Sequence, residues 1–313
     1  MTTRSFPVSR RLLRVIGACL LMTAPSIGAA QGSRPDTTFT LSRGALVDIT
    51  VRRGVLVLRG TDRAEASLRS SNGTVTARST GGGVVLGTRQ AMGRSFTRDT
   101  DASRVELTVP RNVRVVISAG SADVELRDID GDVEIRSSNG DVRMDRLGGR
   151  AIVETLSGDL VITGGVGDVR VTSSSGDVNV EGVRGSVNVT TTSGDVTVLG
   201  TRVPGVRIES ISGDAEFDGS VAPDARVHVS THSGDVALRL GDDARGTLEF
   251  ETHTGEMQTG IPVTTVGPTS GQAPRNRAAQ RYEFGGGGSL SVMISTFSGD
   301  VRFERGSSRS SDR

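Results

Sequence analysis

A column of acidic residues is the feature of this sequence best suited to chemistry. An acidic residue directly follows a glycine at nearly regular intervals, at Asp141, Asp159, Asp177, Asp195, Asp214, Asp235 and Glu256. If these residues stack at strand spacing, like charges lie about 5 Å apart and repel one another. Calcium ions, which bind carboxylate oxygens, could relieve that repulsion. The sequence therefore offers a candidate calcium edge, made of Asp159, Asp177, Asp195, Asp214 and Asp235.

The alternate half of the repeat argues against calcium. Calcium-binding nonapeptide repeats carry a second glycine two residues earlier and an Asp in both halves of each coil. Here Gly149 is followed by Arg150, and Gly185 by Ser186. We therefore expect each Asp to cap a chain corner, screened by water and nearby arginines. We therefore expect no cofactor. If an ion does bind, calcium is the candidate.

Two histidines offer a second candidate metal site. His232 and His253 each lie two residues before a repeat glycine, so we expect them to be neighbours on adjacent coils. With Asp235 or Glu256 they could form a weak zinc site. Elsewhere the same register holds Ser138, Leu156, Ser174, Thr192 and Ile211, which favours an ordinary exposed surface. His228 lies in the preceding strand and is expected to point elsewhere.

Enzymatic chemistry finds little support. Hydrolysis of a glycosidic bond needs two carboxyl groups about 5–10 Å apart in a cleft. The acidic column offers many such pairs, but nothing that would set the pKa of one member apart from the others. The chain has no tryptophan and one tyrosine, Tyr282, so aromatic sugar subsites are scarce. We expect no enzyme, with a polysaccharide-active β-helix enzyme as the alternative.

The elements that position these residues form a repeat. From Gly140 to Gly194 a glycine falls every nine residues, and the second and fourth residues after it are apolar, as in Val178 and Val180. Such alternation is typical of strands with one inward face, and glycine allows the positive φ of a tight corner. The pattern predicts an all-β fold, a single β-solenoid with coils of about 18 residues. Its structural turn glycines are Gly140, Gly158, Gly176, Gly194, Gly213, Gly234, Gly255 and Gly299.

Residues 1–30 read as a signal peptide. Arg4, Arg10, Arg11 and Arg14 precede a short apolar run and a small-residue site before Gln31. General secretion and twin-arginine export both fit this pattern. The single cysteine, interpreted as part of the apolar run, is removed with it, so the mature chain has no disulfide. We expect an exported protein without a transmembrane span after the signal, in the periplasm, on the cell surface or secreted.

The rest of the chain divides by regularity. Residues 31–110 are expected to form irregular coils and an N-terminal cap, which we place at 36–60. Residues 111–305 are expected to form the regular solenoid. A loop insertion is expected at 258–288, where Pro262, Pro268 and Pro274 precede four consecutive glycines. Residues 306–313 are polar and expected to form a disordered tail.

The charge balance bears on the partners. Residues 1–30 hold four arginines and no acidic residue, which leaves 33 basic and 36 acidic residues in the mature chain. Because nucleic-acid binding needs a basic face, we expect no such partner. We expect instead an envelope or surface polymer or protein, or end-to-end self-association through open coil edges.

The sequence also resembles a known family. The repeated Ser-Gly-Asp units, the segment Leu107-Thr108-Val109-Pro110 and the late Phe284-Gly285-Gly286 are similar to exported bacterial β-strand-repeat proteins, a family catalogued as a "putative adhesin" domain of unknown function. The likeness covers most of residues 40–305. It implies a β-helix-like fold and envelope placement, and it supplies no catalytic residues. We therefore expect a non-enzymatic β-solenoid with a structural or adhesive role in the envelope, with a self-assembling periplasmic scaffold as an alternative.

Overall fold

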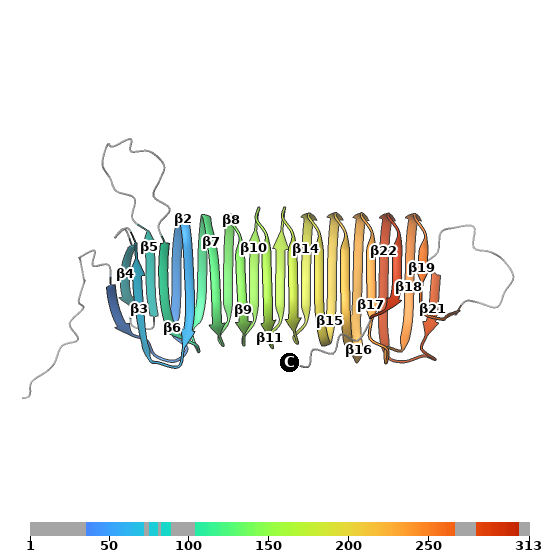
Figure 1. Cartoon of the computed structure of the whole chain (residues 1–313), viewed down its shortest axis with the longest axis horizontal. Helices are drawn as coiled ribbons and strands as arrows, with labels where there is room; N and C mark the ends of the chain where they lie inside the picture. The colour runs from blue at the N-terminus through green and yellow to red at the C-terminus, as the bar shows by residue number, and fades with distance from the viewer. Residues whose placement is uncertain (1–35, 72–74, 81–82, 89–103, 267–279, 307–313) are drawn as a thin grey trace, which may run out of the picture. The chain divides into compact units, whose positions relative to one another are not determined.

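The computed structural model describes residues 36–71, 75–80, 83–88, 104–266 and 280–306, which all belong to the unit Gly32–Arg313. Every regular element within these ranges is a β-strand (Figure 1). The fold is therefore all-β, and it is parallel β-helix-like. The expected signal peptide at 1–30 and nearly all of the expected tail, residues 307–313, lie outside the described residues.

The middle of the chain winds into coils with two sheet faces. Face A contains the strands that precede each Gly-Asp corner, and face B contains the strands that follow it. Residues 18 apart pair in parallel, as Ala151 with Val169 and Leu160 with Val178. Face A contains β8 (Val133–Asn139), β10 (Ala151–Thr155), β12 (Val169–Ser173) and β14 (Val187–Ser193), and face B contains β9 (Val142–Leu147), β11 (Leu160–Gly165), β13 (Val178–Val183) and β17 (Val236–Leu240). Four longer strands contribute to both faces: β2 (Leu46–Thr61), β7 (Arg114–Ile129), β15 (Val196–Ser212) and β16 (Ala215–Ser233).

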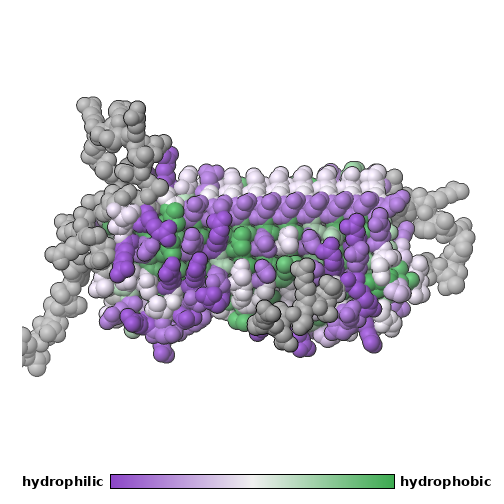
Figure 2. All heavy atoms as spheres, in the orientation of Figure 1, coloured by the Kyte–Doolittle hydropathy of each residue, from purple (hydrophilic) through white to green (hydrophobic). Residues whose placement is uncertain are grey.

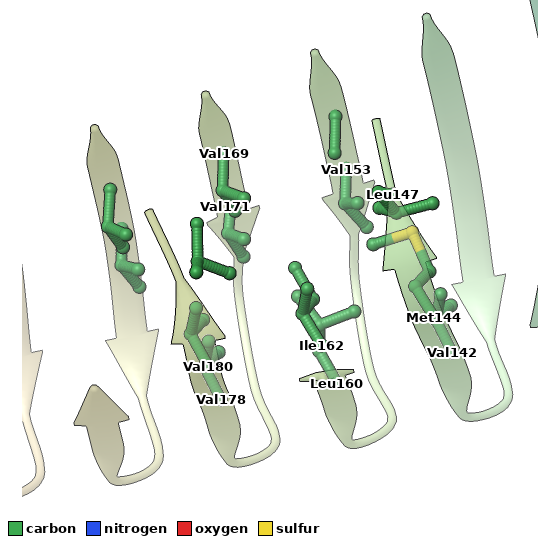
Figure 3. Packing of buried hydrophobic residues seen from close by; sticks show 14 of the residues in the cluster. Val142, Met144, Leu147, Val153, Leu160, Ile162, Val169, Val171, Val178 and Val180 are labelled. Atoms are coloured by element: carbon green, nitrogen blue, oxygen red, sulfur yellow. The ribbon is translucent and has the colours of Figure 1, made fainter. Parts of the chain in front are cut away.

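The core lies between the two faces. Alternate residues of each strand point inward and are buried, so each apolar side chain lies over the equivalent side chain of the coil below (Figure 3). Figure 3 shows such rows, with Val142, Leu160 and Val178 in one of them. One coil cannot bury this apolar side alone, so stacking supplies the core.

The corner glycines are required by close backbone contact. Gly158 has a φ of +111°, and a Cβ atom there would lie 2.4 Å from the carbonyl oxygen of Gly140 in the previous coil. Any side chain would therefore push neighbouring coils apart at this corner. Glycine is required at the corner because the backbones of neighbouring coils are in direct contact there.

The coils do not stack in the order of the sequence. At the C-terminal end, β22 (Leu290–Ser298) pairs on one side with β16 and on the other with β18 (Gly246–Thr254). On face B, β23 (Val301–Arg305) lies in the same way between β17 and β19 (Met257–Thr259). The last coil of the sequence is therefore inserted between two earlier coils, as the red strands between orange ones indicate in Figure 1.

The N-terminal end is built in the same way. β2 pairs on one side with β7, and on the other with β5 (Gly83–Thr88) and β6 (Arg104–Pro110). We expected residues 36–60 to form a cap, but most of that range is β2, a regular coil within the stack. The strands that cover this end are β1 (Asp36–Thr40), β3 (Glu65–Ser70) and β4 (Val75–Thr80), which pair antiparallel.

The C-terminal end carries a comparable antiparallel cover. β21 (Gln280–Phe284) pairs with residues 246–250 of β18, and β20 (Val263–Thr265) pairs with β21. These strands and β19 lie within 258–288 or overlap it, where the sequence suggested a loop insertion. Phe284 packs edge-on against Phe303 of the inserted coil, with ring centroids 5.2 Å apart. The irregular segment therefore contributes core contacts at this end.

Candidate functional site

The acidic residues form a hydrogen-bonded ladder along one edge of the stack. The backbone N–H of Asp159 donates to Oδ1 of Asp141 at 3.1 Å, and the N–H of Asp177 donates to Oδ1 of Asp159 at 3.1 Å. The contact recurs from coil to coil through Asp123, Asp141, Asp159, Asp177, Asp195, Asp214, Asp235, Asp300 and Glu256, which we call the Asp ladder. Figure 2 shows an uninterrupted hydrophilic row along this edge.

The ladder explains how like charges tolerate one another at coil spacing. In each Asp one carboxylate oxygen accepts a backbone N–H of the next coil, which satisfies a donor that the corner would otherwise expose. This is the corner-capping role expected from the sequence, except that each Asp caps the next coil. Within the described ranges, no group of three or more His, Cys, Asp or Glu side chains is arranged to hold a metal ion.

At the opposite corner of the coil the same contact occurs, but only in single steps and not as a continuous series. The N–H of Arg150 donates to Oδ1 of Asp132 at 3.1 Å, and the N–H of Ser186 donates to Oδ1 of Asp168 at 2.9 Å. We had interpreted the half-coil at Gly149 and Gly185 as broken because no acid follows these glycines. The missing acid ends the series after one step, but the backbone donor is still satisfied from the coil below.

The histidines are arranged differently from the expectation. His232 and His253 are not on adjacent coils, because the inserted strand β22 lies between β16 and β18. Phe297 of β22 is stacked between them, with ring centroids 4.7 Å from His232 and 4.5 Å from His253. The phenyl ring separates the imidazoles, so this pair cannot share one zinc ion in this arrangement.

The three stacked rings form one wall of a shallow hollow on the outer side of face A. Its volume is about 360 Å³, and its lining includes Ser230, Ser295 and Glu251. Sequence reasoning missed Phe297, although it stands two residues before Gly299, in the same register as both histidines. The register was visible in the sequence, but the neighbours depend on the order of the coils.

A second hollow lies on the same face toward the start of these strands. Its volume is about 370 Å³, and Arg207, Arg226 and His228 contribute to its lining. His228 is half-buried, and its pKa is lowered first by burial and then by the positive charge of Arg207. His228 thus lies at a hollow, whereas the sequence placed it only in the preceding strand.

Face B carries a bidentate ion pair that shifts a pKa. Arg146 donates from Nε and Nη2 to the two carboxylate oxygens of Asp128 at 2.8 and 3.0 Å. This bidentate contact holds the pKa of Asp128 below its usual value, mainly through the hydrogen bond. Both residues have positive φ, 61° and 55°, and they repeat a bend one coil apart. The pair orders the surface of face B and does not resemble a catalytic pair.

The family of the chain follows from its sequence profile. A profile of the Toastrack DUF4097 family matches residues 47–304, which is most of the chain. The protein belongs to this family. The membership confirms the resemblance drawn from the Ser-Gly-Asp units, and the matched range includes both inserted coils.

Comparison with solved structures gives distant likenesses. A "putative adhesin" from Bacteroides fragilis is 11% identical with a TM-score of 0.45, covering 85% of this chain and 95% of the other. A "putative adhesin" from Parabacteroides distasonis is 10% identical with a TM-score of 0.37, covering 86% and 95%. A "putative lipid binding protein" from the same species is 11% identical with a TM-score of 0.28, covering 85% and 95%.

Two further comparisons complete the description. No curated protein sequence gives a significant match to the chain. Within the described residues, no helix has the length and apolar character needed to cross a membrane.

Proposed function

We propose that this Toastrack protein is an exported, non-enzymatic β-solenoid with a structural or adhesive role in the cell envelope. The observation that carries the proposal is the Asp ladder, which fixes carboxylates at one-coil spacing along a whole edge. Weak contacts at fixed spacing add through multivalency. An envelope or surface polymer, or a repetitive protein, is the class of partner that such an edge suits.

Export rests on residues 1–30, and the adhesive role requires exposure on the cell surface. The test is protease treatment of intact cells, with this protein followed by antibody and a periplasmic protein as the marker. We expect the protein to be degraded while the marker is spared. Survival until the envelope is opened would exclude the adhesive role and leave a periplasmic structural role.

Self-assembly into a periplasmic scaffold is the alternative. Coil-on-coil stacking needs an open parallel edge. β4 pairs with β5 at one end and β21 pairs with residues 246–250 at the other, which leaves a short stretch of the described chain, residues 251–254 and β19, without an outer strand. Stacking over these strands would have to displace them. We therefore expect a concentration-independent monomer in sedimentation. Filaments that grow with protein concentration would instead favour the scaffold.

A further inference from the structure

The hollow at Arg226 arises because the residues beside this long side chain on both neighbouring strands are small. Arg226 pairs across the strands with Gly205 on one side and Ser291 on the other. Neither neighbour fills the space beside the guanidinium, and a Cβ atom at Gly205 would come no closer than 3.6 Å to other atoms. The result is a recess of about 370 Å³ on the outer side of face A, within the size range of small-ligand sites.

A second row of side chains forms the wall of this recess. Arg207, His228 and Met293 lie side by side on β15, β16 and β22. Because residues two apart in a strand point to the same side, His228 and Arg226 both face outward. Met293 is an exposed apolar side chain at the recess, whereas Val206 and Val227 underlie its floor and are buried in the core. A charged group and the apolar side chain of Met293 therefore meet at one place.

The charges around the recess leave one positive charge uncompensated. Arg207 is paired with Glu209, with an N–O distance of 2.6 Å. Glu249, beside Met293 on the next coil, lies 3.6 Å from Arg281. Within the described residues, the guanidinium of Arg226 has no hydrogen bond or ion pair. Burial, and then the positive charge of Arg207, lower the pKa of His228, while the nearby Glu209 opposes this shift.

We propose that this recess binds the carboxylate of a small amphiphilic molecule, with the carboxylate on Arg226 and the apolar chain toward Met293. One uncompensated charge matches a monoanion, and a guanidinium presents a fork of donors that fits a carboxylate. The imidazole of His228 and the hydroxyl groups of Ser186 and Ser291 offer further hydrogen bonds. The site adds small-molecule binding to the proposed structural role and does not depend on the partner of the Asp ladder.

The experiment uses the histidine ring signals of the mature protein in NMR. The chain has only three histidines, so the signal of His228 can be assigned by substitution. Octanoate, acetate and glucuronate are titrated separately. We expect octanoate to shift the His228 signal and raise its pKa, because a bound anion stabilises the imidazolium, and to bind at least tenfold more tightly than acetate or glucuronate. If acetate binds as tightly as octanoate, the proposed contact between an apolar chain and Met293 is wrong. If glucuronate binds most tightly, the ligand is an acidic sugar and not an amphiphile.

A pair of arginine variants separates the site from general charge effects. Arg226→Gln should abolish the octanoate-dependent shift while the signals of His232 and His253 stay unchanged. Arg302→Gln is the matched control, since Arg302 is an exposed arginine on face B of the inserted coil. It should bind octanoate like the parent protein. An unchanged response in Arg226→Gln, or no response of the parent protein to octanoate, would refute the proposal.

Discussion

At the scale of single residues, the corner glycines carry the tightest geometric demand. Gly176 combines a φ of +104° with a virtual Cβ 2.3 Å from the carbonyl oxygen of Gly158. We expect Gly176→Ala to lower the free energy of unfolding by more than about 2 kcal/mol, because strain and backbone overlap add. Urea unfolding measures the change.

Gly44 provides the matched control for this substitution. It has a φ of +76°, but no atom lies within 4 Å of its virtual Cβ. Gly44→Ala should cost only the conformational strain, about 1–2 kcal/mol. Equal losses in the two variants would show that backbone overlap between coils is not what selects glycine at the corners.

The Asp ladder leads to an expectation about calcium. Since one oxygen of each carboxylate already accepts a backbone N–H, as at Asp177, the like charges are stabilised without a metal. We expect millimolar calcium chloride to leave the melting temperature unchanged relative to magnesium chloride. A rise specific to calcium would show that metal binding stabilises the folded chain and would revive the calcium edge.

The ion pair between Asp128 and Arg146 predicts a pH-dependent loss. The pKa of Asp128 is lowered in the folded state, so its contribution is present above the unfolded pKa of about 3.9 and is lost as the pH falls through the folded value. Asp128→Asn should therefore destabilise the protein more at pH 7 than at pH 2. Asp224→Asn, which removes a carboxylate at an exposed position without an ion pair among the described residues, is the matched control. An equal loss of unfolding free energy at pH 7 and pH 2 in Asp128→Asn would show that the ion pair with Arg146 does not stabilise the folded state.

At the scale of strands and coils, the inserted C-terminal coil is the decisive element. β22 separates β16 from β18 along face A, so removing it leaves two buried surfaces without a neighbour. We expect truncation after residue 288 to prevent cooperative folding of the C-terminal coils. Truncation after residue 306 keeps the whole coil and should unfold like the full chain. Amide hydrogen exchange, read coil by coil, measures both.

Much of this element level could be predicted from the sequence. The alternation around Val178 and Val180 gave the strands, their inward faces and the 18-residue spacing, because these depend on local pattern. The coil order could not be predicted, because β18 and β22 carry interchangeable patterns: Leu248 and Phe250 in one, Val292 and Ile294 in the other. The local pattern therefore does not decide which of the two strands pairs with β16 in the full chain. The arrangement of His232, Phe297 and His253 depends on that choice, as does the recess beside Met293.

At the scale of the whole stack, the coil is the unit of length. Deletion of residues 159–176 removes one full coil and joins Gly158 to Asp177, which restores a Gly-Asp corner over Gly140. We expect this variant to fold, with a urea m-value reduced roughly in proportion to the residues removed. Deletion of residues 159–167 removes half a coil and moves every later Asp of the ladder to the opposite edge. That variant should be strongly destabilised, and equal stability of the two would argue against the coil as the unit.

The insertion of both terminal coils has a consequence for incomplete chains. β2 is followed by its two neighbours on the N-terminal side, β5 and β6, within about 50 further residues, so this end can close without the rest of the chain. The C-terminal end closes only when β22 and β23 take their place between coils that precede them in the sequence. A chain that ends before residue 290 lacks the strands that separate β16 from β18 and β17 from β19. The native coil order at this end therefore depends on residues 290–305, and a chain without them cannot reach it.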